Sequence, residues 1–91
     1  MLKQVHLYIK GDVIGVGFRA WTKIQAKILR VNGWVRNVDH QEVEAVLQAD
    51  EAVLNKMIGL LKKGPPISRV DDVDIIWESP KEAFDGFEIR K

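Results

Sequence analysis

The chain has no cysteine among its 91 residues, so neither disulfides nor thiolate metal sites can support its fold, which fits a reducing compartment. It also has no excess of one charge, because 14 Lys and Arg oppose 13 Asp and Glu. Any anion must therefore bind at a local site rather than through bulk charge. No apolar run approaches the roughly 18 residues of a membrane span. We expect a cytoplasmic protein that binds neither nucleic acid nor a membrane.

The chain does contain a glycine-broken loop, Gly11–Arg19, between a predicted strand and a predicted helix. The strand is indicated by alternating apolar residues, namely Val5, Leu7 and Ile9. The helix is indicated by apolar residues at helical spacing, namely Trp21, Ile24, Ile28 and Val31. A helix N-terminus has unpaired N–H groups and favours negative charge, and no Ser, Thr, Asp or Asn at positions 15–20 caps those groups. The loop is therefore a candidate phosphate site.

A glycine-rich loop alone is weak evidence for a phosphate site. Water can satisfy the free N–H groups, and glycines also serve tight turns with positive φ. The loop lacks the Gly-Lys-Ser/Thr ending of a P-loop, and its glycines do not have the spacing of a dinucleotide-binding motif. The loop by itself therefore leaves a phosphate site and a plain turn open.

The remaining pattern predicts two strands, then a second helix, and then two further strands. Strands are expected at Gly33–Val38, Glu42–Ala49 and Arg69–Glu78, with a short fifth at Gly86–Arg90. The inward faces of the third and fourth strands are expected to be Val43, Ala45 and Leu47, and Val73, Ile75 and Trp77, with Glu42, Glu44 and Gln48 outward. The second helix begins near Asp50, a candidate N-cap, and ends before Gly64. Its apolar face is Leu54, Met57, Ile58 and Leu61.

This βαββαβ order predicts an α+β fold over a single domain, residues 1–91. The expected architecture is a ferredoxin-like sandwich, in which both helices cover one face of an antiparallel sheet. In this topology the first two strands are parallel with the third between them, so their C-terminal ends lie on one edge, roughly 10 Å apart. Arg19 and Asn37 follow these ends and should therefore converge.

Two separate motifs in this chain resemble those of the acylphosphatases. Gly11–Arg19 is similar to the first family signature, and Gly33–Asn37 followed by Val43-Glu44 is similar to the second. The resemblance covers essentially the whole chain. It implies an enzyme that hydrolyses acyl phosphates to a carboxylate and inorganic phosphate by in-line water attack. It implies no metal and no cofactor, a small-molecule substrate, phosphate as product and inhibitor, and a monomer.

The resemblance also implies the roles of individual residues. The phosphoryl group is expected to contact backbone N–H groups of Gly15, Val16, Gly17, Phe18 and Arg19. Arg19 acts as the charged clamp, because its planar fork makes two charge-assisted bonds to phosphoryl oxygens. Asn37 orients the attacking water. Neither motif supplies a clear general acid, which favours a carboxylate leaving group that needs no protonation.

Two residues depart from the family pattern. Ile14 stands where glutamine is usual, and Gln41 stands where glycine is usual in the hairpin turn. A non-glycine residue at positive φ costs about 1 kcal/mol, so the turn is expected to change type and to shift Asn37. The alternative function is a non-catalytic phosphate-binding domain of the same family. An RNA-binding module is disfavoured, because Glu42, Glu44 and Gln48 face outward from the third strand.

Overall fold

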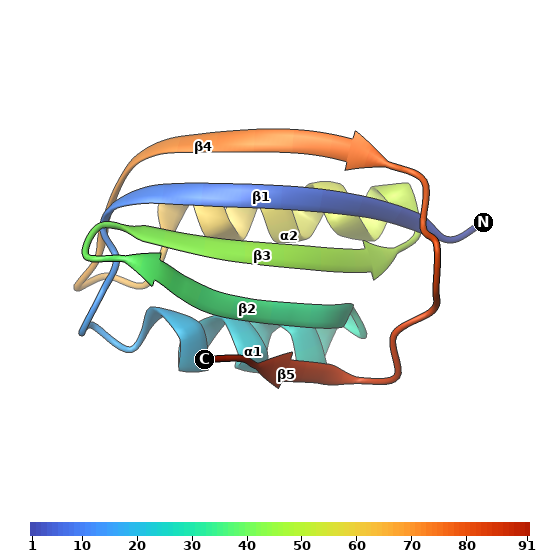
Figure 1. The fold of residues 1–91 in the computed structure, drawn as a ribbon, viewed down its shortest axis with the longest axis horizontal. Coiled ribbons are helices and arrows are strands. Elements are labelled where there is room, and N and C mark those ends of the chain that lie inside the picture. The colour runs from blue at the N-terminus through green and yellow to red at the C-terminus, as the bar shows by residue number, and fades with distance from the viewer.

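The computed structural model describes all of residues 1–91 as a five-stranded sheet with two helices on one face (Figure 1). The elements are β1 (Lys3–Asp12), α1 (Phe18–Leu29), β2 (Asn32–Asp39), β3 (Glu42–Ala49), α2 (Glu51–Lys63), β4 (Arg69–Glu78) and β5 (Phe87–Ile89). The strand order is β4-β1-β3-β2-β5. The predicted ferredoxin-like α+β fold is confirmed. None of its helices is long and apolar enough to cross a membrane.

The strand pairing places the C-terminal ends of β1 and β2 on the same edge of the sheet. Both strands pair antiparallel with β3, which lies between them, so they run parallel to each other. The short β5 pairs parallel with β2 and makes the sheet mixed rather than wholly antiparallel. Figure 1 shows β5 beside β2 and α1, at the outer edge of the sheet.

The core lies between the sheet and the helices, and most of its predicted members are buried. The three inward residues of β1 and the four residues of the predicted apolar face of α2 are all buried: Val5, Leu7, Ile9, Leu54, Met57, Ile58 and Leu61. The predicted fourth strand has the expected bounds, but Trp77 is 45% exposed. It lies at the outer end of β4, an edge strand, so its inward orientation does not bury it.

The predicted apolar face of α1 is right at its two ends, where Trp21 packs against the core and Val31 is buried just after the helix, and wrong in its middle. Ile24 and Ile28 are 55% and 69% exposed, whereas the residues fully buried against the sheet are Phe18, Thr22 and Ala26. The small side chains of Thr22 and Ala26 allow the helix to approach the sheet closely. Thr22 is buried without an unpaired hydroxyl, because its Oγ1 donates to the Phe18 carbonyl at 2.8 Å.

Asp50 lies at the N-cap of α2 as expected, but its side chain makes no capping hydrogen bond. Its carboxylate instead lies 3.4 Å from the N-terminal amino group. The prediction was right about the position and wrong about the bond.

The face of the sheet away from the helices also buries polar residues. Glu44 and Gln48 of β3 are 5% and 2% exposed, although both were expected to face outward into solvent. Gln48 is covered by the segment after β4, where it donates to the Glu82 carbonyl at 2.6 Å and accepts from the Phe84 N–H at 2.9 Å. A central strand is therefore buried on both faces.

Candidate active site

The loop before α1 presents unpaired backbone N–H groups. Gly15 and Gly17 have φ values of 75° and 76°, a left-handed conformation that side chains disfavour. The first α1 bond is made by the Trp21 N–H, which donates to the Gly17 carbonyl at 2.9 Å, and no side chain caps the helix. No hydrogen bond outside the helices and strands uses the N–H groups of residues 15–19. The loop therefore offers several donors to an anion.

Asn37 near the end of β2 has a side-chain oxygen that lacks a hydrogen-bond partner. The strand turns this residue toward the helix side of the sheet, in register with the fully buried Val43 of β3. Its Oδ1 is the one buried side-chain polar atom of the protein without a partner. A buried acceptor left unpaired costs about 1–3 kcal/mol, so its presence points to a function.

A cavity of about 190 Å³ brings the two predicted polar residues together. Its walls come from the loop, the first turn of α1, β2 and β5: Val13, Gly15, Gly17, Phe18, Arg19, Ala20, Asn37 and Ile89. The half-buried Arg19 is in no hydrogen bond or ion pair of its side chain, so its guanidinium is free for a ligand. No Asp, Glu, His, Lys, Tyr or Cys lines this cavity. It can bind an anion but offers no side chain that readily donates a proton.

Ile89 is a cavity residue that the sequence reasoning missed. The alternation with Phe87 indicated a strand, but no local pattern says which neighbour that strand pairs with. The parallel pairing with β2 sets Ile89 opposite Val35, two residues before Asn37. A strand pairing between distant segments therefore completes the wall beside Asn37.

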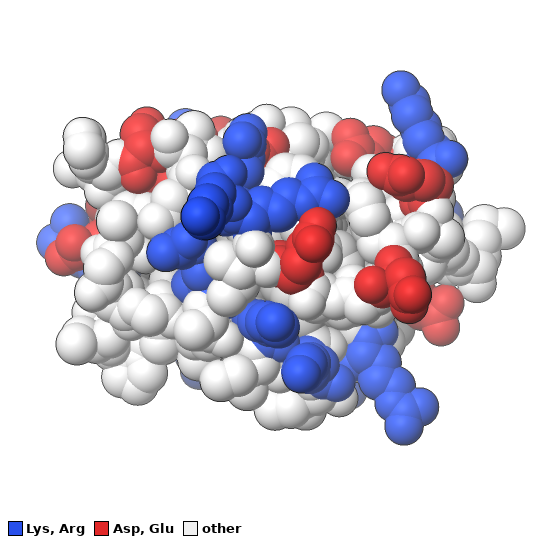
Figure 2. Space-filling model, turned by 60° about the horizontal axis from the view of Figure 1, so that its bottom comes forward, with Lys and Arg blue, Asp and Glu red and all other residues white.

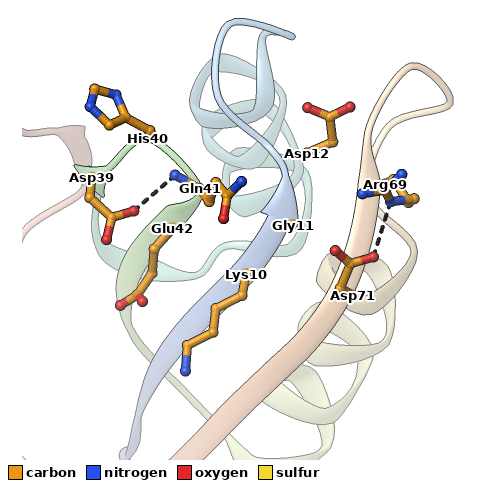
Figure 3. A pocket seen from close by; sticks show the side chains of 9 residues that line it. All are labelled: Lys10, Gly11, Asp12, Asp39, His40, Gln41, Glu42, Arg69 and Asp71. Atoms are coloured by element: carbon orange, nitrogen blue, oxygen red, sulfur yellow. Dashed lines mark hydrogen bonds and ion pairs between the residues drawn. The ribbon is translucent and has the colours of Figure 1, made fainter.

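The hairpin between β2 and β3 accommodates Gln41 without a positive φ. Arg30 is the one non-glycine residue with positive φ in the chain. The Gln41 N–H donates to Asp39 Oδ1 at 2.8 Å, and its carbonyl accepts from the Gly11 N–H at 3.0 Å (Figure 3). The register of β2 and β3 shifts between Asn37 and Asp39. Gln41 therefore takes no strained backbone conformation, and Asn37 lines the 190 Å³ cavity.

The same hairpin borders a larger cavity of about 630 Å³, which no hydrophobic residue lines (Figure 3). It lies between the hairpin and the start of β4, where Arg69 pairs with Asp71 at 3.0 Å. Neither Arg19 nor Asn37 lines it. No group of three or more His, Cys, Asp or Glu side chains in the protein is placed to hold a metal ion.

Glu44 lies on the open face of the sheet, which is the face away from the helices, and it binds a residue of β2, the strand that carries Asn37. Arg36 Nε donates to Glu44 Oε1 at 2.6 Å, and His6 Nε2 lies 2.5 Å from Glu44 Oε2. Burial alone would raise the pKa of Glu44, but these hydrogen bonds outweigh it and hold the pKa below its ordinary value. The bond between Arg36 and Glu44 therefore holds the side chain that immediately precedes Asn37.

Comparisons with known proteins show the family of this chain. The acylphosphatase family model matches residues 5–89. An acylphosphatase of Natronomonas pharaonis is 41% identical, covering 97% of this chain and 95% of that protein. One of Thermococcus kodakarensis is 43% identical, covering 94% and 93%. The crystal structure of the Bacillus subtilis acylphosphatase superposes with a TM-score of 0.93 at 32% identity, covering 100% of both chains.

The fold and the cavity at one end of β1 and β2 define a small α+β protein of the ferredoxin-like class. The chain belongs to the acylphosphatase family, and it is an enzyme that hydrolyses acyl phosphates. The alternative of a non-catalytic phosphate-binding domain is not favoured.

Proposed function

We propose that this enzyme binds the phosphoryl group of an acyl phosphate in the 190 Å³ cavity and directs water at it through Asn37. The observation that supports this most strongly is the unpartnered, buried Oδ1 of Asn37 in the cavity that also holds the free Arg19. The two residues are 18 positions apart and come from different elements. Residues 1–91 act together as one domain in this proposal.

The phosphoryl group is held by the loop and by Arg19. Phosphoryl transfer needs positioning and neutralisation of the equatorial oxygens more than covalent chemistry from the protein. The N–H groups of Gly15, Val16, Gly17, Phe18 and Arg19 supply fixed donors, and the α1 dipole adds partial positive charge. The guanidinium of Arg19 makes paired bonds to two oxygens, which a lysine ammonium cannot reproduce.

The attacking water is held by Asn37. Its Oδ1 accepts a hydrogen bond from this water and so relieves the cost of the unpaired acceptor. An amide accepts and donates hydrogen bonds without taking up a proton at neutral pH. The proton of the water therefore passes to the substrate phosphate, and Asn37 fixes only the direction of attack.

The leaving group explains why acyl phosphates are the substrates. The cavity walls contain no side chain suited to act as a general acid. An alkoxide leaving group requires such an acid, whereas a carboxylate, whose conjugate acid has a pKa of about 4 to 5, leaves without a proton. The site therefore acts on mixed anhydrides of carboxylic and phosphoric acid, and alkyl phosphate monoesters react slowly. The proposed mechanism uses no metal ion and no cofactor.

The test is hydrolysis of benzoyl phosphate in EDTA by the purified protein, with an alkyl phosphate monoester as the second substrate. We expect turnover of the acyl phosphate alone, competitive inhibition by inorganic phosphate, and a monomer by light scattering. The Arg19→Ala variant serves as the blank. Equal hydrolysis of the monoester, or activity that disappears in EDTA, would contradict the proposed mechanism.

A further inference from the structure

A row of free cations extends from the phosphate site along α1. Arg19, Lys23 and Lys27 are spaced four residues apart, so their side chains project from one side of the helix. Neither lysine forms an ion pair or a side-chain hydrogen bond. Figure 2 brings the side of the molecule formed by α1 and β5 forward and shows Lys and Arg side chains there, with Asp and Glu side chains between them and to their right. The row therefore begins inside the candidate active site.

A second, separate cavity lies farther along α1, between this helix and the segment that contains β5. It has a volume of about 420 Å³, and its walls are Lys23, Lys27, Gly33, Phe84, Asp85, Gly86, Phe87 and Glu88. The first cavity ends at Ala20 and Ile89, each of which is within a few residues of a wall of the second. The two cavities thus lie in sequence along the same pair of elements.

The acidic residues of this second cavity leave Lys23 as the cation available nearest the site. Glu88 already pairs with Arg90 at 2.6 Å. Asp85 is unpaired but precedes β5, and β5 and α1 run in opposite directions (Figure 1), so it lies toward the C-terminal end of α1, on the side of Lys27. Lys27 is about 12 Å along α1 from Arg19, whereas Lys23 is only about 6 Å away.

Resting on the proposed function, we propose that Lys23 forms a second anion subsite, which makes this enzyme favour acyl phosphates whose acyl part carries a second anionic group. The two residues are about 6 Å apart along the axis of α1, and we take this spacing as the separation between the two anionic groups. An extended acyl chain advances about 1.2 Å per bond, so a carboxylate about five bonds from phosphorus fits. Succinyl phosphate has this length, and butyryl phosphate has the same chain without the terminal charge.

The two nearby arginines of the open face do not provide this subsite. Arg36 is bonded to Glu44 at 2.6 Å, and Arg90 is bonded to Glu88 and lies 4.7 Å from the centroid of the Trp34 ring. Both guanidiniums are thus held by carboxylates of the protein. No carboxylate of the protein pairs with Lys23, and its half-buried position restrains the stem of the side chain.

The experiment compares kcat/KM for succinyl phosphate with kcat/KM for butyryl phosphate in four proteins: wild type, Lys23→Met, Lys23→Arg and Lys56→Met. Methionine keeps the apolar stem and removes the charge. Lys56 is an exposed lysine of α2 outside both cavities, so its variant controls for net charge. Loss of one exposed ion pair should change the ratio of kcat/KM for succinyl phosphate to kcat/KM for butyryl phosphate about twofold to fivefold.

We expect Lys23→Met to lower the ratio by this factor, with kcat/KM for butyryl phosphate unchanged. Lys23→Arg keeps the charge and Lys56→Met lies outside both cavities, so both variants should have the wild-type ratio. Added salt should lower the ratio in wild type, because it screens the ion pair. An unchanged ratio in Lys23→Met, or an equal fall in Lys56→Met, overturns the subsite. If wild type hydrolyses neither substrate, the proposed function fails instead.

Discussion

Replacing Asn37 by alanine should separate activity from stability. In the folded protein the Asn37 Oδ1 is buried without a partner, and the side chain makes no hydrogen bond. An unpaired buried acceptor costs about 1–3 kcal/mol, which the alanine variant regains. The lost packing of the amide costs about 1 kcal/mol, because each atom pair contributes only about 0.1–0.2 kcal/mol. The free energy of unfolding should therefore stay within about 1 kcal/mol of wild type or increase.

Turnover should fall sharply in the same variant. Without the amide, water is no longer held in line, and loss of one preorganised polar group at a reacting centre lowers kcat about 10²- to 10³-fold. Inhibition by inorganic phosphate should persist, because the loop and Arg19 are unchanged. The assays are benzoyl phosphate hydrolysis and urea unfolding followed by tryptophan fluorescence, in a protein whose total stability is of the order of 5–14 kcal/mol.

Asn32→Ala is the matched control on the same strand. The Asn32 amide donates to the Phe84 carbonyl at 3.1 Å, so its removal leaves that carbonyl unpaired and should destabilise the fold by about 1–2 kcal/mol. Activity should be retained, because Asn32 lines neither the active-site cavity nor the loop. The reasoning is refuted if Asn37→Ala keeps wild-type kcat, or if it destabilises the protein more than Asn32→Ala does.

Three further changes test other parts of the structure. Arg19→Lys should weaken inhibition by phosphate at least about tenfold and lower kcat/KM about 10²-fold, because the ammonium lacks the planar fork; inhibition kinetics measures both. Gly17→Ala should fold but lose about 1–2 kcal/mol and bind phosphate more weakly, since its φ is 76° and an added Cβ meets nothing within 4 Å; phosphate titration and urea unfolding check this. Glu44 should add to acid sensitivity: its pKa is lowered from 4.5 in the folded state, so its stabilisation is present above that value and is lost as pH falls through the folded pKa. Urea midpoints from about pH 6 to pH 3 should therefore fall less in Glu44→Gln than in wild type.

Each of these changes has an outcome that contradicts it. Unaltered phosphate inhibition in Arg19→Lys would show that the loop N–H groups bind the anion alone. Failure of Gly17→Ala to fold would indicate a steric conflict that the open space around its Cβ position excludes. Parallel pH profiles for wild type and Glu44→Gln would mean that the bonds from Arg36 and His6 do not favour the ionised carboxylate.

The sequence predicted the fold well where a local pattern was compatible with only one kind of secondary structure. Alternation in β1 and β3 and the apolar face of α2 led to the correct elements, since strands of period 2 and helices of period 3.6 bury different positions. The convergence of Arg19 and Asn37 followed from topology, because β1 and β2 must run parallel once β3 lies between them.

The sequence failed where burial depends on a partner rather than on spacing. Isoleucines of α1 at helical spacing suggested a buried face, yet Ile24 and Ile28 are exposed, because the helix packs through Thr22 and Ala26. Trp77 has an inward register but lies near the end of an edge strand. Apolar spacing indicates which residues share a face, but it does not say which face another element covers.

The sequence by itself determined the order of elements and the glycine-broken loop before a helix that no side chain caps. These features depend on backbone geometry and on interactions between residues near in the chain. Only the tertiary structure decided that Ile89 closes the cavity beside Asn37, that Glu44 is buried between Arg36 and His6, and that Lys23 faces β5. Each of these contacts joins segments far apart in sequence, so it exists only once strand pairing and helix packing bring them together.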